Sequence, residues 1–225
     1  MNFSEDLYLN FHAHQQKPGE KEIVIQSIFL QENLVTPKSD KIFFTSGLHP
    51  WHANLLNKHE IDLRLNSLIK SNSIVAIGET GIDKLKGPDV NTQTKVFIQH
   101  VEIAEKYNMP IIVHSVKAHN ELLKLKKELK SKVPWVIHHF NGSKQMAFDL
   151  IDHGFYLSLS YHIKNNSSRL SDYLRELPIN KIFLETDDFD IKIKDLYKTA
   201  AQKFEISIEE LINQLMNNLK SLLNE

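Results

Sequence analysis

The sequence contains no cysteine among its 225 residues. This absence excludes disulfide bonds, thiolate metal sites, iron–sulfur clusters and a cysteine nucleophile. Any metal ion must therefore be held by nitrogen and oxygen ligands.

The chain also lacks a long hydrophobic run. No segment approaches the roughly 18 apolar residues that a membrane-spanning helix needs. The N-terminal stretch MNFSEDLYLNFHAH does not combine a basic region with an apolar one, as a signal peptide would. We therefore expect a cytoplasmic protein with no membrane partner.

Neither sign of charge dominates, because 27 basic and 28 acidic residues leave a formal net charge of -1. No overall positive field would attract nucleic acid, which weakens the case for tight duplex binding. Bound divalent cations would supply local positive charge, so the balance does not exclude a nuclease. The sequence has no internal repeat, low-complexity tract or linker, and we predict a single domain over residues 1–225.

Apolar runs bounded by turn signals predict eight strands, most of them nearly continuous in Ile, Val, Leu and Phe, as parallel strands covered by helices are. The predicted strands are residues 7–11, 23–28, 42–46, 74–77, 111–113, 134–138, 155–159 and 181–184. Eight strands alternating with helices are typical of a TIM-type (β/α)8 barrel, so the expected fold class is α/β.

Helical segments are predicted between the later strands and at the C-terminus. They cover residues 54–71, 92–107, 117–131, 143–153 and 167–177, and a last helix follows an S-x-x-E capping box at Ser207 and Glu210. In the first third, residues 15–22 and 29–41 are too short and too broken by Pro18, Gly19 and Pro37 for crossover helices. The barrel should be incomplete or distorted there.

Histidines and acids follow most of the predicted strands. The carboxyl ends of parallel barrel strands meet at one face, so residues scattered along the chain can converge on one pocket. The candidates are His12, His14, His49, Glu79, His114, His138 and Asp187. This pattern predicts a metal-dependent hydrolase.

His12 and His14 lie two residues apart, so in an extended chain both imidazoles point the same way and can bind one cation. An H-x-H pair alone is weak, and two incidental histidines are the alternative. Asp187 lies in IFLETDDFD, where an acid cluster predicts either a metal site or a solvated turn. At a metal site, Asp187 could bind the cation and accept a proton from a water that the cation activates.

Glu79 lies in AIGETGID, and its carboxylate could bridge two cations. The alternative is a loop or helix-capping acid, but Gly78 and Gly81 favour a tight turn close to a ligand. His138 is followed by His139, and only one of the pair can face a barrel interior. Periodicity in WVIHH does not decide between them.

Six motifs occur in the order H-x-H, GLHPW, GETGID, VHS, HHFNGS and ETD. In this order they resemble the TatD family of metal-dependent deoxyribonucleases, which have amidohydrolase-like barrels. The resemblance runs from about Leu7 to the final helix. It is carried by GLHPWHA, AIGETGID, FIQHVEIAEKYNMPIIVHS, IHHFNGSKQMAFDLIDHGFYLSLS and KIFLETD.

The resemblance implies two divalent metal ions. One is held by His12, His14 and Asp187, the other by His114 and His138, and Glu79 bridges them. Asp187 and Glu79 are then the catalytic residues. The family's H-C-F-S-G motif aligns its histidine with His138 and its cysteine with His139, and His49 resembles a residue that contacts the substrate near its phosphate.

The sequence departs from the family at Lys84 and Val116, where tyrosine and arginine are usual. Lys84 or Lys117 could replace these phosphate contacts. The proline- and arginine-rich loop that normally follows E-T-D-S-P is absent, since FDIKIKDLYK leads almost directly to the last helix. We expect a more open site.

The expected activity is cleavage of phosphodiester bonds in DNA, single-stranded DNA above all, with no obligate protein partner. One alternative is a metallohydrolase of the same fold that acts on a small ester, amide or phosphate. Another is a catalytically silent binding or scaffold barrel. Histidine and carboxylate ligands suit Zn, Mn, Fe or, less well, Mg.

Overall fold

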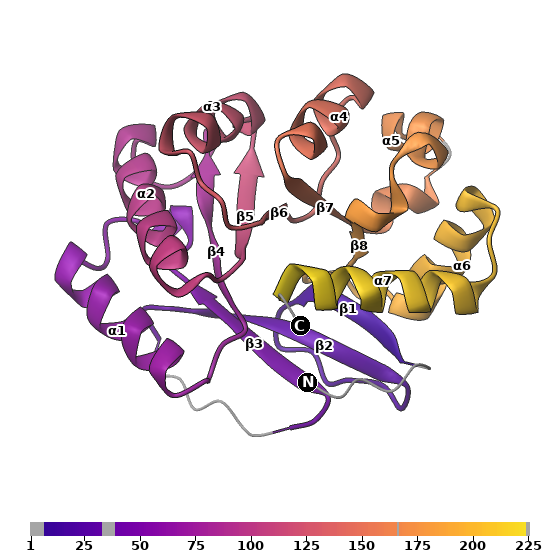
Figure 1. Cartoon of the computed structure of the whole chain (residues 1–225), viewed down its shortest axis with the longest axis horizontal. Helices are drawn as coiled ribbons and strands as arrows, with labels where there is room; N and C mark the ends of the chain where they lie inside the picture. The colour runs from indigo at the N-terminus through magenta and orange to yellow at the C-terminus, as the bar shows by residue number, and fades with distance from the viewer. Residues whose placement is uncertain (1–6, 33–38, 166, 224–225) are drawn as a thin grey trace. The chain divides into compact units, whose positions relative to one another are not determined.

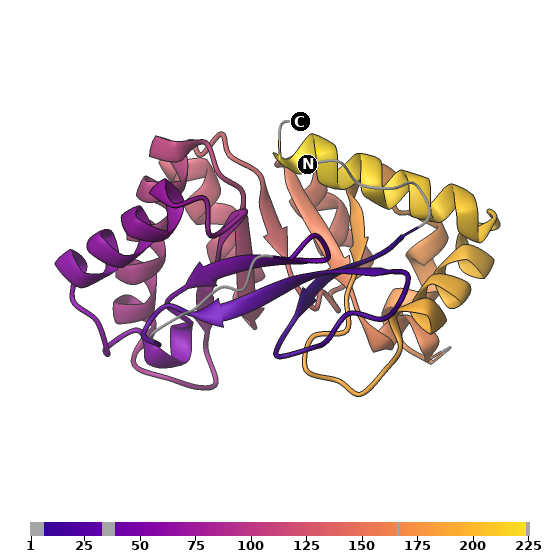
Figure 2. The ribbon, with the colours of Figure 1, turned by 90° about the horizontal axis from the view of Figure 1, so that it is seen from below.

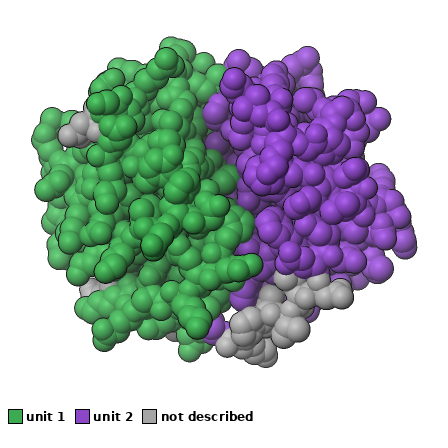
Figure 3. Space-filling view, turned by 180° about the vertical axis from the view of Figure 1, so that it is seen from behind, with its two compact units in different colours: residues 1–26, 40–42, 138–225 green, residues 27–39, 43–137 purple. Residues whose placement is uncertain are grey.

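The computed structural model of the chain describes residues 7–32, 39–165 and 167–223. Two compact units make up the chain (Figure 3). Unit 1 contains residues 1–26, 40–42 and 138–225, and unit 2 contains residues 27–39 and 43–137. The single domain expected over residues 1–225 stays a prediction.

Unit 1 is built on parallel strands from both ends of the chain. Strand β1 (Tyr8–Ala13) pairs with β2 (Glu22–Phe29), with Leu9 opposite Ile23. Strand β7 (Phe155–Leu159) pairs with β8 (Ile182–Leu184). An isolated bridge between Ala13 and Asp187 connects the end of β8 to β1.

Helices α4 (Lys144–Asp152), α5 (Arg169–Tyr173), α6 (Ile193–Phe204) and α7 (Ile208–Leu223) complete unit 1. Helix α7 begins at the predicted capping box, in which Ser207 N donates to Glu210 Oε2 (2.8 Å) and Glu210 N donates to Ser207 Oγ (3.1 Å). Its apolar stripe, Leu211, Leu215, Leu219 and Leu222, is buried. The helix packs against β1, β8 and α6 (Figures 1 and 2).

Unit 2 has four parallel strands in chain order. They are β3 (Ile42–Gly47), β4 (Ala76–Asp83), β5 (Ile111–Val116) and β6 (Trp135–Ile137). Helix α2 (Val90–Tyr107) packs on β4 and on α1 (Lys58–Lys70), and α3 (His119–Leu129) packs on β5 (Figure 1). Among the described helices of both units, none has the length and apolar character to cross a membrane.

The predicted strands all form, but β4 is longer than expected and runs through Gly78 and Gly81 to Asp83. The tight turn predicted at these glycines is therefore wrong. A Cβ atom on Gly81 would lie 2.0 Å from His114 O, and one on Gly78 would lie 2.4 Å from Ile112 O. Both glycines thus allow β4 to approach β5 closely, and Glu79 is a strand residue.

Helix α6 is the one described α-helix of unit 1 that the sequence did not predict. Lys192, at its N-cap, makes no side-chain capping hydrogen bond, so the usual start signal is missing. No crossover helices were expected early in the chain, and the described residues 14–21, 30–32 and 39–41 contain no helix. Residues 33–38 lie outside the described residues.

His100 fixes the loop that carries His49. It is fully buried in α2, its Nε2 accepts a hydrogen bond from Leu48 N (3.0 Å), and its Nδ1 lies 2.8 Å from Val96 O. Burial disfavours the charged imidazole and lowers the pKa of His100 to about 4. His100 therefore stays neutral at pH 7 and anchors the backbone directly before His49.

The depressed pKa of His100 makes folding sensitive to acid. The unfolded chain binds this proton first, so the stabilisation is complete above pH 6.5 and is lost as the pH falls toward about 4. In the variant His100→Gln, the amide oxygen can still accept from Leu48 N, but no proton is taken up. We therefore expect the free energy of unfolding to fall by roughly 3 kcal/mol less in the variant than in the wild type between these pH values, since one pKa unit corresponds to about 1.4 kcal/mol. Urea denaturation across this pH range measures the effect, and parallel stability profiles for the variant and the wild type would contradict it.

Candidate metal centre

The backbone of Asp187 is paired with β1 next to two histidines. Asp187 N donates to His12 O (2.9 Å), and Asp187 O accepts from His14 N (3.3 Å). The backbone at Asp187 is left-handed, with φ of 55°, a conformation that aspartate adopts more readily than most residues. These hydrogen bonds place the carboxylate between the two imidazoles.

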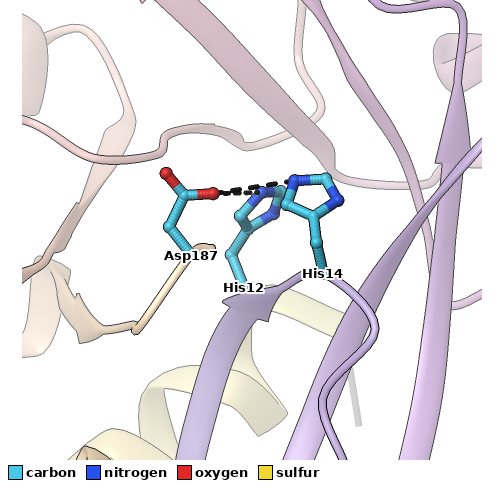
Figure 4. Close-up of side chains that lie close together, drawn as sticks. All are labelled: His12, His14 and Asp187. Atoms are coloured by element: carbon cyan, nitrogen blue, oxygen red, sulfur yellow. Dashed lines mark ion pairs between the residues drawn. The ribbon is translucent and has the colours of Figure 1, made fainter. Parts of the chain in front are cut away.

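The side chains of His12, His14 and Asp187 form a compact group (Figure 4). Asp187 Oδ1 lies 3.8 Å from His12 Nε2 and 3.6 Å from His14 Nε2. Ligand atoms about 2.1 Å from one ion would lie roughly 3.0–3.4 Å apart, so a shift of a few tenths of an ångström would complete the coordination. The His12 side chain is fully buried, and those of His14 and Asp187 are 22% and 16% exposed. Two imidazoles and one carboxylate therefore fit a divalent cation.

His49, Glu79 and His114 form a second group, in unit 2. Glu79 Oε1 lies 2.6 Å from His114 Nδ1 and 3.2 Å from His49 Nε2, and all three residues are buried. The two imidazoles are themselves 3.3 Å apart, between His49 Nε2 and His114 Nδ1. Ligand atoms from the three side chains lie within 4.8 Å of one another, so this group also suits a cation.

Asp83 extends the second group on the far side of the His114 ring. Its Oδ2 accepts from Trp51 Nε1 (2.6 Å) and lies 3.3 Å from His114 Nε2. Burial alone would raise the pKa of Asp83, but hydrogen bonds from Trp51, from Leu85 N and from His114 outweigh burial and hold this pKa below its ordinary value. Asp83 is therefore ionised at neutral pH and orients the imidazole of His114.

The adjacent histidines after β6 both face acids of unit 1. His138 is buried, its ring centroid lies 4.5 Å from that of His12, and its Nδ1 lies 3.4 Å from Glu185 Oε1. His139 Nδ1 lies 3.2 Å from Asp187 Oδ2, and His139 N donates to Glu185 Oε1. His139 thus contacts the Asp187 carboxylate, and the His138 ring lies close to the His12 imidazole at a tilted angle.

The predicted substrate-contacting residues have different surroundings. His49, expected to contact substrate, is packed against two of the predicted ligands, Glu79 and His114. Lys84 forms an ion pair with Glu121, whereas Lys117 is exposed just after β5. Their roles toward a substrate stay predictions.

Asp83 and Glu185 are site residues to which sequence reasoning gave no role. Alternate residues of a strand point to the same side, so Asp83 shares the side of Glu79 once β4 is known to continue past Gly81. Glu185 directly follows β8, two residues before Asp187, and is fully buried. The four-residue spacing between Glu79 and Asp83 is visible in the sequence, but the turn expected at Gly78 and Gly81 led away from a continuous strand.

Comparison with known proteins agrees with these motifs. Residues 23–224 match the family described as TatD related DNase. An uncharacterized metal-dependent hydrolase of Buchnera aphidicola is 36% identical over 158 residues, covering 67% of this chain and 60% of the relative. A putative deoxyribonuclease TATDN1 homolog of Enterocytozoon bieneusi is 27% identical and covers 90% of this chain and 81% of the relative.

A solved structure confirms the fold class. The crystal structure of YjjV, a TatD homolog from Escherichia coli, superposes with a TM-score of 0.81 at 20% identity and covers 99% of this chain and all of that one. The predicted α/β fold of the TIM-barrel type is therefore confirmed. The chain spans less than two thirds of the first curated relatives, 60% of the Buchnera protein and 56% of an Escherichia coli hydrolase.

The geometry around Asp187 predicts metal-dependent stabilisation. We expect Mn²⁺ or Zn²⁺ to raise the melting temperature of the wild-type protein, and His14→Ala to weaken the ion's affinity at least ~10-fold by removing one ligand. His14 is partly exposed, so its loss should leave the fold intact. His59→Ala, at an exposed histidine of α1, is the matched control. Isothermal titration calorimetry measures the affinities, and equal values for the two variants would argue against a metal ion at His14.

Proposed function

Because the chain belongs to the family of TatD related DNases, we propose that it is a divalent-metal-dependent hydrolase that cleaves phosphodiester bonds in DNA. The observation that carries this proposal is the group of His12, His14 and Asp187, whose donor atoms suit a divalent cation. A divalent cation, when bound, lowers the pKa of a water molecule and neutralises charge on phosphate oxygens.

We infer the ligands partly from geometry and partly from the family resemblance. His12, His14 and Asp187 are supported by their proximity in unit 1. The assignment of His114 and His138 to a second ion, with Glu79 bridging, rests on the resemblance. The close contact of Glu79 with His114 in unit 2 agrees with a shared role for these two residues.

We propose that Asp187 acts as the general base. Its Oδ1 faces the imidazoles of His12 and His14, and its Oδ2 faces His139 Nδ1. A carboxylate that contacts three imidazoles and is 16% exposed can still accept a proton from an attacking water molecule. His12 and His14 orient this carboxylate, and we propose that Asp187 takes up the proton as the phosphodiester is attacked.

Contacts to the phosphate come in this proposal from His49, Lys84 and Lys117. Lys117 is exposed and is available to an anionic substrate without rearrangement. Lys84 must first leave its ion pair with Glu121, an exchange that costs little because both side chains are about one third exposed. Glu79 holds the His49 ring at 3.2 Å and so fixes its orientation.

A small ester, amide or phosphate compound is the second candidate substrate. The sequence feature that favours it is the segment after Asp187, FDIKIKDLYK, which lacks the arginine- and proline-rich loop expected in the family. Fewer cationic contacts would weaken binding to a long polyanion more than binding to a small ester. Turnover of single-stranded DNA, compared with a panel of small esters and amides, distinguishes the two substrates.

Removing a proposed ligand should abolish hydrolysis without unfolding the protein. We expect Glu79→Ala and His138→Ala to lower kcat for single-stranded DNA more than ~100-fold in Mn²⁺, because each removes a ligand of the reacting centre. The matched control is His153→Ala, at an exposed histidine that follows α4. Cleavage is followed with an end-labelled oligonucleotide, and circular dichroism checks the fold.

Full Mn²⁺-dependent cleavage by both Glu79→Ala and His138→Ala would refute the proposed centre. If the protein hydrolyses small esters but does not cleave DNA, the proposed metal centre stands and the proposed DNA substrate is wrong. No divalent-dependent stabilisation and no turnover of either class would identify a silent binding barrel.

A further inference from the structure

A cluster of aromatic rings lies beside Asp187 in unit 1. Tyr161 and His162 begin the 3-10 helix η2 (Tyr161–Lys164) directly after β7, and Phe189 follows Asp187 by two residues. The His139 ring lies 5.5 Å from Tyr161, 5.1 Å from His162 and 5.3 Å from Phe189, between ring centroids. Tyr161 lies 4.4 Å from Phe189, so the rings form one connected group.

This cluster is not part of the core of unit 1. Tyr161, His162, Phe189 and His139 are all half-buried. The core aromatics of the unit, such as Phe140, Phe155, Phe183 and Tyr197, are instead almost completely buried. Four neighbouring rings that keep part of their surface in water are more than packing requires, and such a patch is typical of a ligand-binding surface.

The aromatic cluster is joined to the candidate metal-binding group through His139. His139 Nδ1 lies 3.2 Å from Asp187 Oδ2, while Asp187 Oδ1 faces His12 and His14. The aromatic cluster is therefore directly adjacent to the Asp187 carboxylate, with His139 as the ring in contact with it. A substrate whose reacting group lies at Asp187 would extend over these rings within the length of a single nucleotide.

The charged residues around the aromatic cluster determine which part of a nucleotide can bind to it. Asp188 and Asp190, on either side of Phe189, are exposed and would repel a phosphate. Burial is the largest cause that lowers the pKa of His162 and so favours its neutral imidazole. An uncharged, planar ring fits this surface better than a phosphate or a sugar.

We propose that His139, Tyr161 and Phe189 form a stacking platform for one unpaired nucleobase adjacent to the phosphodiester that reacts at Asp187. The inference rests on the proposed function and assigns a binding place to one base of its substrate. Bases in a duplex are already stacked on both faces, so only an unpaired base can lie on protein rings. Stacking contacts the face common to all four bases, so the platform predicts little sequence preference.

The test compares two fluorescein-labelled strands of equal length, one of deoxythymidine and one whose sugars carry no bases. Fluorescence anisotropy in EDTA gives the Kd of each strand without cleavage. We expect the wild-type protein to bind the base-bearing strand about tenfold more tightly, since one stacked base is worth about 1–3 kcal/mol. The combined substitution Tyr161→Leu and Phe189→Leu should remove that preference while preserving apolar volume.

Two control variants separate stacking from folding. Tyr161→Phe keeps the ring and should keep the preference for the base-bearing strand. Tyr107→Leu removes an equally half-buried ring at the end of α2, in unit 2, and should change nothing. Circular dichroism and the melting temperature of each variant verify that it is folded.

The platform is overturned if the wild-type protein binds both strands equally or binds neither, or if the Tyr161→Leu, Phe189→Leu protein keeps the wild-type ratio of affinities. The proposed function fails separately, if wild-type protein with Mn²⁺ cleaves no phosphodiester. A base preference that depends on Tyr161 and Phe189, without cleavage, would support the platform and refute the proposed reaction.

Discussion

The backbone pairing between Asp187 and β1 is the interaction on which the candidate site of unit 1 depends. Two hydrogen bonds, Asp187 N to His12 O and His14 N to Asp187 O, join residues that are far apart in sequence. Since main-chain pairing fixes position more rigidly than side-chain contacts do, the carboxylate is placed beside both imidazoles before any ion binds. His139 contacts the same carboxylate and connects it to the neighbouring aromatic rings.

The second group shows that the site is organised for chemistry more than for stability. Glu79 and Asp83 are each 3% exposed, and removing a carboxylate from water is costly unless it is paired. Both are paired with His114, and Glu79 also with His49, through contacts of 2.6–3.3 Å. An apolar set of residues would pack such a strand end at lower cost, so the presence of buried acids and imidazoles here agrees with the proposed metal centre.

The sequence predicted the elements whose signals are local. The strand cores, the capping box at Ser207 and the common side of His12 and His14 follow from apolar runs, capping chemistry and alternation along a strand, whereas the grouping of both histidines with Asp187 was implied by the family resemblance. It could not predict contacts set by backbone approach. The strand through Gly78 and Gly81 depends on the nearness of β5, which turn statistics do not include. Helix α6 lacks a capping side chain, which is the sequence signal that would have predicted its start. The proximity of His49 to Glu79 and His114, and the role of Asp83, follow from that strand.

The most direct measurement is anomalous X-ray diffraction from crystals of the protein grown with Mn²⁺ or Zn²⁺. We expect an anomalous peak about 2.0–2.2 Å from His12 Nε2, His14 Nε2 and a carboxylate oxygen of Asp187. Saturating metal with no peak at these three residues would contradict a metal centre at Asp187.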